Sequence, residues 1–131
     1  MGQLVIDTSA VIAAVLNEPE KERLVELTDG EELIAPSSLH WEVGNAFSAM
    51  FKRGRLKLRE AQRAIREYQK IPIRFVDVDL SEAMRFAEKE NIYAYDAYFV
   101  VCAKKQRLAL LSLDRLLMDV SKNNRVRLLE V

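Results

Sequence analysis

The sequence predicts a three-layer α/β/α fold built on a five-stranded, mainly parallel sheet. Short apolar runs typical of buried strands occur at residues 3–6, 32–35, 73–78, 108–112 and 126–131. The gaps between these runs carry apolar residues at helical spacing. Helices that alternate with short apolar strands indicate a parallel sheet covered on both faces.

The length and composition favour one domain outside a membrane. A chain of 131 residues can bury one proper core, and we expect a single domain over residues 1–131. Its longest apolar run, residues 10–16, falls far short of the roughly 20 residues that a membrane span needs. No basic segment precedes that run and no cleavage site follows it, so we expect a cytoplasmic protein. The one cysteine, Cys102, lies in an apolar stretch and is expected to be a reduced, packed thiol.

The first strand, residues 3–6, ends at a carboxylate that separates two apolar segments. Leu4, Val5 and Ile6 read as a strand, and residues 10–16 read as an apolar helix, so Asp7 falls at the turn between them. One interpretation is that Asp7, Thr8 or Ser9 caps the helix. The other is that Asp7 is presented to a functional site.

A helical hairpin is expected at about residues 38–70, between the second and third strands. The first helix begins near Ser37 or Ser38 and ends at Gly54. Its apolar residues follow the helical pattern at Val43, Ala46, Phe47, Met50 and Phe51. The second helix is expected to place Leu58, Ala61, Ile65 and Tyr68 on its apolar side.

Four carboxylates stand where strands end or helices begin. Asp7 follows the first strand, Asp114 follows the fourth, Glu42 lies in the first turns of the helix after the second, and Asp96 opens the helix before the fourth. The carboxyl ends of parallel strands form the usual binding edge of such a sheet. The four acids could therefore converge there.

Local explanations for these acids remain open. Asp96 in "AYDAY" could simply favour the positive end of its helix dipole. Glu42 and Asn45 could be a hydrogen-bonded pair on a helix surface. If the acids do cluster, their repulsion requires a cation, and all-oxygen ligands select Mg²⁺ or Mn²⁺.

A magnesium or manganese site of this kind commonly polarises a phosphoryl oxygen and activates water. His40 could be invoked as a general base. It is the single histidine, and we interpret it as structural, beside Trp41, which we expect in the core.

The chain resembles the PIN-domain nucleases, and among them the VapC-type toxins of toxin–antitoxin pairs. The resemblance runs over essentially the whole chain through "VIDTSAVIA", "EVGNAF", "YDAYFVVCA" and "LLSLDRLL", in the family's order and spacing. It implies that the catalytic, metal-binding quartet is Asp7, Glu42, Asp96 and Asp114. Asn45, Ser112 and Thr8 would support this quartet, with Ser112 standing where the family usually has Thr. Asp119 is read as an exposed helix residue.

The resemblance further implies a metal-dependent endoribonuclease that leaves a 5′-phosphate and a 3′-hydroxyl. It also implies a homodimer and a VapB-type antitoxin that blocks the crevice. One alternative is a housekeeping RNA-processing or DNA-acting nuclease of the same fold. Others are a phospho-receiver, which would need an acidic pair after the first strand, and a catalytically silent RNA-binding domain.

Charge is balanced overall but uneven along the chain. Residues 18–32 hold seven acids and two bases, whereas residues 52–70 hold eight bases and two acids. The second hairpin helix carries a basic stripe at helical spacing, made of Arg59, Arg63, Arg66 and Lys70. We interpret this stripe as an RNA-binding surface, with a solvated face or an antitoxin docking surface as the alternatives.

Overall fold

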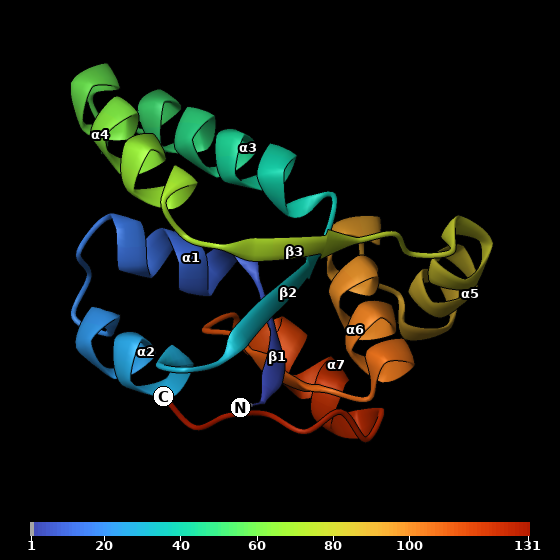
Figure 1. The fold of residues 1–131 in the computed structure, drawn as a ribbon. Coiled ribbons are helices and arrows are strands. Elements are labelled where there is room, and N and C mark those ends of the chain that lie inside the picture. Colours follow the sequence, from blue (N-terminus) through green and yellow to red (C-terminus); the bar gives the residue numbers. More distant parts are fainter. Residues whose placement is uncertain (1) are drawn as a thin grey trace.

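The computed structural model describes residues 2–131 and contains a four-stranded parallel sheet (Figure 1). Along the chain the strands are β1 (Gln3–Ile6), β2 (Glu32–Pro36), β3 (Ile73–Val76) and β4 (Ala109–Leu111). Their order across the sheet is β3-β2-β1-β4, and every neighbouring pair is parallel. The predicted fold class is therefore confirmed, with one strand fewer than expected.

Seven helices of the described chain surround the sheet. They are α1 (Thr8–Val15), α2 (Lys21–Thr28), α3 (Leu39–Lys52), α4 (Leu58–Gln69), α5 (Leu80–Glu90), α6 (Ala94–Gln106) and α7 (Arg115–Asn123). Helix α1 packs against α2, α3 and α4, whereas α6 packs against α5, α7 and the central strands. Figure 1 shows these two groups on opposite sides of the sheet, which makes the three layers.

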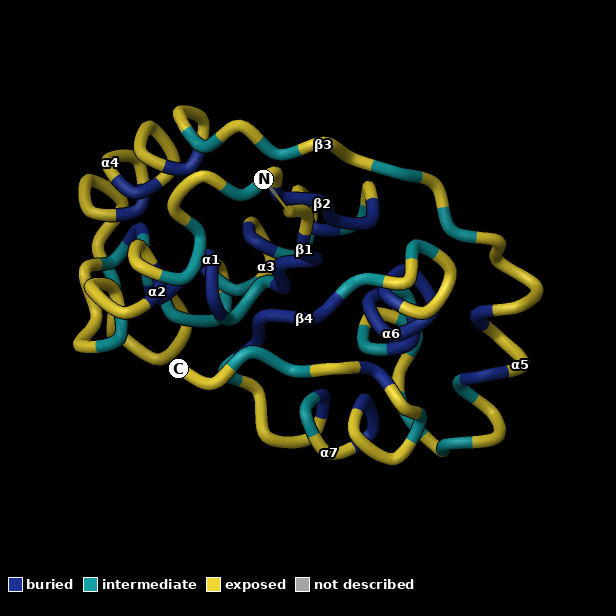
Figure 2. The backbone as a smooth tube through the Cα atoms, turned by 60° about the horizontal axis from the view of Figure 1, so that its bottom comes forward, coloured by how far each residue is buried: buried dark blue, intermediate teal, exposed yellow. Residues whose placement is uncertain are grey.

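The core lies where the middle strands meet the helices. Val5, Ile34 and Leu110, from three adjacent strands, are fully buried, as Figure 2 shows for the segments around them. Val11 of α1 and Val100 of α6 are also fully buried. Strand β3 lies at the edge of the sheet. The sheet centre is thus closely packed on both faces.

The expected fifth strand at residues 126–131 is wrong. This segment meets β4 at a single parallel bridge, Leu110 to Leu128. The N–H of Leu110 donates to the carbonyl of Arg127, and the N–H of Leu129 donates to the carbonyl of Leu110. Because β4 has only three residues, the tail cannot pair with it over a longer stretch.

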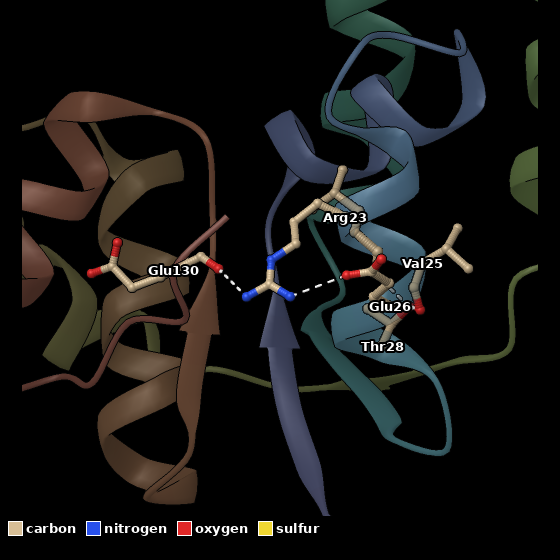
Figure 3. Close-up of polar contacts among 6 residues, drawn as sticks. Arg23, Val25, Glu26, Thr28 and Glu130 are labelled. Atoms are coloured by element: carbon tan, nitrogen blue, oxygen red, sulfur yellow. Dashed lines mark hydrogen bonds and ion pairs between the residues drawn. The ribbon is translucent and has the colours of Figure 1, made fainter.

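The tail is also tied to α2. Nη2 of Arg23 donates to the backbone carbonyl of Glu130 at 3.1 Å, and Nη1 lies 3.2 Å from Oε2 of Glu26 (Figure 3). The bond from Arg23 holds the last residues of the chain against α2.

Helices α3 and α4 occupy the region of the expected hairpin, but some of the apolar residues do not lie as expected. Trp41 is 71% exposed and Leu58 is 62% exposed, and Ile65 is also exposed. Helix α4 packs on α1, and its buried residues are Ala61, Ala64 and Tyr68. Leu58 lies one turn before this contact, and Ile65 lies beside it, so neither is covered.

The remaining apolar features agree with the sequence. Cys102 is buried, and its burial raises the pKa of the thiol to about 11. Within residues 2–131, no helix combines the length and the apolar character that a bilayer span requires.

Candidate active site

The turn between β1 and α1 fixes Asp7 in a buried position. Its N–H donates to the carbonyl of Leu111 at 3.2 Å, which extends the β1–β4 pairing by one residue. Its side chain caps α1, because Oδ1 accepts the N–H of Ala10 at 3.0 Å. The Asp7 residue is only 3% exposed. The capping interpretation is therefore correct for Asp7, and Thr8 and Ser9 are left free for other contacts.

Besides the helix N–H that it caps, the Asp7 carboxylate is held by two serine hydroxyls. Oγ of Ser112 donates to Oδ2 of Asp7 at 2.6 Å. Oγ of Ser9 lies 2.8 and 2.9 Å from the two carboxylate oxygens. Ser9 also accepts the N–H of Leu113 at 2.9 Å. Asp7 is thereby held at the junction of β1 with the β4–α7 turn.

The β4–α7 turn presents the second carboxylate. The N–H of Asp114 donates to Oγ of Ser112 at 3.0 Å, and Oδ1 of Asp114 accepts the N–H of Leu117 at 3.1 Å, which caps α7. Asp114 itself is exposed. One hydroxyl, that of Ser112, therefore links the two acidic turns.

Glu42 reaches the same edge from the start of α3. Its Oε1 accepts a hydrogen bond from Oγ1 of Thr8 at 3.3 Å, and its Oε2 accepts one from Oγ of Ser38 at 3.0 Å. Burial raises the pKa of Glu42 to about 7, and the charges of Asp96 and Asp7 add to the rise, against the lowering effect of the two hydroxyls. Thr8 thus connects Glu42 to the turn that holds Asp7.

Asp96 lies half-buried in the first turn of α6. Burial raises its pKa, and the nearby charge of Asp114 adds to the rise. The placement beside a helix N-terminus is favourable for a carboxylate. Helix α6 contacts α7, and Asp96 in the first turn of α6 repels Asp114, which caps α7.

Asp7 is electrostatically linked to the others. Burial raises its pKa to about 6. Hydrogen bonds from Ser112, Ala10 and Ser9 act in the opposite direction, and the charge of Asp114 adds to the rise. We call the edge formed by Asp7, Glu42, Asp96 and Asp114 the carboxylate edge. Its members come from four separate helix starts and repel one another when ionised.

The donor chemistry of the carboxylate edge fits a hard cation. Carboxylate and hydroxyl oxygens surround it, and oxygen ligands suit Mg²⁺ and Mn²⁺. Among residues 2–131, the side chains as placed form no group of three or more Asp, Glu, His or Cys that could hold one ion. Three of these acids would therefore have to come closer together to coordinate one ion.

Several residues singled out in the sequence lie apart from this edge. Asn45 is exposed on α3, and no hydrogen bond of its side chain occurs within residues 2–131. The Nδ1 atom of His40 lies 3.4 Å from the hydroxyl of Tyr68, and the ring packs on Trp41, so the histidine contacts α4. Asp119 is exposed on α7.

The basic stripe lies on the exposed side of α4. Its members Arg59, Arg63, Arg66 and Lys70 are all exposed, and Nζ of Lys70 lies 3.3 Å from Oε1 of Glu67.

Two hydroxyls in the site were missed as site residues in the sequence. Ser9 bridges Asp7 and the N–H of Leu113, and Ser38 orients Glu42. For Ser38 a signal exists, because it lies four residues before Glu42 and so on the same helical face. For Ser9 the bond to the Leu113 N–H spans 104 positions, which no local pattern indicates.

Residues 4–123 match the family model described as PIN domain. The VapC ribonuclease Mb0985 of Mycobacterium bovis is 28% identical over 120 residues, which cover 91% of this chain and 91% of that protein.

Solved structures share the fold at low identity. The structure of PAE2754 from Pyrobaculum aerophilum matches with a TM-score of 0.72 and 22% identity, covering 93% of this chain and 89% of that one. VapBC2 from Rickettsia felis, bound to a DNA fragment from their promoter, matches with a TM-score of 0.66 and 13% identity over 98% of both chains.

Proposed function

The chain belongs to the PIN domain family, and on that premise we propose that it is a metal-dependent endoribonuclease, the toxin of a toxin–antitoxin pair. The similar VapC ribonuclease supports RNA as the substrate. The fold shared with VapBC2 supports a VapB-type antitoxin as the partner. We also propose a cytoplasmic location and a homodimer.

The observation that carries this proposal is the carboxylate edge itself. Four acids at the starts of α1, α3, α6 and α7 lie close enough to influence one another electrostatically, and three of them have raised pKa values because of burial and the charges of neighbouring acids. A fold gains no stability from such repulsion. Perturbed carboxylates at the binding edge of a parallel sheet are therefore best explained by function.

We assign the ligand role to Asp7, Glu42, Asp96 and Asp114, which would hold Mg²⁺ or Mn²⁺. When bound, this ion supplies a Lewis acid for the phosphoryl group and lowers the pKa of water. Cleavage would leave a 5′-phosphate and a 3′-hydroxyl.

The hydroxyls of the chain have a positioning role. Ser112 and Ser9 fix the orientation of the Asp7 carboxylate, while Thr8 and Ser38 fix that of Glu42. Each hydroxyl donates to a carboxylate oxygen, so it favours the ionised form that a cation requires.

The test is cleavage of a mixed RNA pool by the purified protein. We expect cleavage with Mg²⁺ or Mn²⁺, none in EDTA, and recovery when the metal is restored. Mapping the ends tests the expected 5′-phosphate. DNA of the same sequences is the matched control, and preferential cleavage of that DNA would replace the ribonuclease by a DNA-acting nuclease.

Metal binding has a separate test that does not depend on activity. An ion that binds only the folded state raises the melting temperature by mass action. We expect a rise with Mg²⁺ or Mn²⁺ that is smaller in Asp7→Asn and unchanged in Asp119→Asn. An equal rise in Asp7→Asn would contradict the ligand role of Asp7.

A further inference from the structure

A second charged feature lies at the opposite end of β4 from the carboxylate edge. A hollow of about 420 Å³ opens between the end of α6, the start of β4 and the chain that follows α7. Its lining includes no acidic residue. Four of the lining residues are cationic, and we call the hollow with these four the far-edge pocket: Lys104, Arg107, Arg125 and Arg127.

The cations of the far-edge pocket have no anionic partner within residues 2–131. All four are exposed, and none takes part in an ion pair of the described chain. Lys104 is engaged only partly, with Nζ 5.8 Å from the ring centre of Phe86. Like charges gathered around one hollow repel each other, so the arrangement does not stabilise the fold. A bound anion would relieve this repulsion.

Two of these arginines have a left-handed backbone conformation that glycine adopts with less strain. Arg107 caps α6 with φ of 57° and ψ of 45°, and Arg125 follows α7 with φ of 63°. In this left-handed region a side chain costs roughly 1 kcal/mol, and helices commonly use Gly there. Backbone strain of this kind tends to persist where a side chain has a function.

Two residues that line the far-edge pocket also line a second hollow beside α7. This second hollow, of about 400 Å³, shares Val126 and Arg127 with the pocket, and its lining also includes Arg115 and Lys122. Arg115 directly follows Asp114, whereas Lys122 lies near the other end of α7. Nine residues of helix span about 13 Å. Asp119 and Glu130 also line this second hollow, so its charge is mixed.

We propose that the far-edge pocket binds backbone phosphates of an RNA strand whose cleaved bond lies at the carboxylate edge. This identification of the ligand class rests on the proposed function. Guanidinium groups match phosphate oxygens in geometry and charge. A polyanion with regularly spaced phosphates can contact both hollows at once, whereas a small anion can occupy only one. Ala103, Ala109 and Val126 form an apolar floor between the cations.

The strained arginines permit a variant that removes charge without threatening the fold. In Arg107→Gly/Arg125→Gly, two cations are lost at positions where glycine relieves strain, so the melting temperature should stay equal or rise. Binding of a mixed-sequence, fluorescently labelled single-stranded RNA is measured in EDTA across a salt series. Each lost phosphate contact reduces the magnitude of the slope of log affinity against log salt by about 0.7. This corresponds to about a fivefold smaller change in affinity for each tenfold change in salt.

For the double glycine variant, we expect the magnitude of the salt slope to fall by about 1.4. If both proteins bind RNA equally at 1 M salt, the variant then binds about 25-fold more weakly than wild type at 0.1 M. The matched control is Arg107→Lys/Arg125→Lys, which keeps both charges and should keep most of the slope. A second comparison is Arg59→Gln/Arg63→Gln/Arg66→Gln, which removes charge from α4 alone.

An unchanged salt slope in the double glycine variant would overturn the inference, as would a loss of slope in the lysine variant equal to that in the glycine variant. If RNA binding is unchanged while binding of the purified antitoxin weakens, the pocket docks protein and the inference is wrong. If the protein binds RNA through this pocket but cleaves none with either metal, the proposed activity fails and the pocket assignment stands.

Discussion

The hydroxyl of Ser112 donates a 2.6 Å hydrogen bond to the Asp7 carboxylate across 105 positions of sequence. The same oxygen accepts the N–H of Asp114 at 3.0 Å. One buried side chain thus joins the turn after β1 to the turn after β4 and fixes the separation of two proposed metal ligands. A hydroxyl is suited to this position because it donates and accepts at once.

Ser112→Ala is expected to lower the free energy of unfolding by about 1–3 kcal/mol, since it leaves a buried carboxylate with one hydrogen bond fewer. Cleavage should fall as well, because Asp7 loses its orientation. Urea unfolding at pH 7.5 and RNA cleavage measure the two effects.

The matched control for this serine is Ser121, which is also buried but whose Oγ has no hydrogen-bond partner within residues 2–131. Ser121→Ala removes an unsatisfied hydroxyl and should leave stability unchanged or raise it by about 1 kcal/mol. Ser112→Thr keeps the hydroxyl and should keep more activity than Ser112→Ala. Equal losses in Ser112→Ala and Ser121→Ala would show that the Asp7 bond has no special role.

Asp96→Asn should reduce RNA cleavage at least 100-fold, about 2.7 kcal/mol of transition-state stabilisation. The amide keeps the shape of the side chain but loses the charge that holds a cation. Initial rates with Mg²⁺ measure the effect, and Asp119→Asn, an exposed acid on α7, is the control. Activity of Asp96→Asn within threefold of wild type, in a folded protein, would remove Asp96 from the site.

The carboxylate edge was predictable because its members follow a rule of topology. Parallel strands end at one edge, so Asp7 and Asp114, each directly after a strand or its turn, had to lie near each other. Glu42 followed from its place in the first turns of a helix. The bonds that orient these acids were less predictable, since Ser9 meets Leu113 only after the sheet forms.

The sequence pattern predicted the burial and pairing of the outer elements less well. The spacing of Leu58 and Ile65 fits an apolar helix face, yet both are exposed and the buried residues of α4 are Ala61, Ala64 and Tyr68. The segment 126–131 has the composition of a strand but meets only three residues of β4. The far-edge pocket had no sequence signal either, because its cations come from two segments that β4 and α7 bring together.

Asp7 should make stability depend on pH. Its pKa rises from 3.8 to about 6 on folding, so between these pH values the folded state binds more protons than the unfolded state. The free energy of unfolding then falls as pH rises from about 4 to above 6. At about 1.4 kcal/mol per pH unit, the loss is about 3 kcal/mol.

Asp7→Asn should flatten this decline and make the metal-free protein more stable than wild type at pH 7.5. Asparagine still caps α1, so the helix is retained. Urea unfolding in EDTA from pH 4.5 to 7.5 is the measurement, with Asp119→Asn as the variant expected to follow wild type. A decline of equal size in Asp7→Asn would assign the pH dependence to other groups, Glu42 first among them.

The basic stripe of α4 provides a further test of where RNA binds. Glu60 is occupied at the helix start, where Oε1 accepts the N–H of Lys57 at 2.9 Å, and Glu67 pairs with Lys70. Arg59, Arg63 and Arg66 therefore keep their charge available for phosphates.

Replacing these three arginines by glutamine should weaken RNA binding similarly for all sequences and flatten the salt slope by about 2, which is 0.7 for each contact. Cleavage at saturating RNA should change little, because the stripe is expected to bind substrate and not to take part in the chemistry. Lysine at the same three positions keeps the charge and is the matched control. An unaltered slope in the glutamine variant would leave the stripe as an antitoxin docking surface or a solvated face, and weaker antitoxin binding by that variant would distinguish the two.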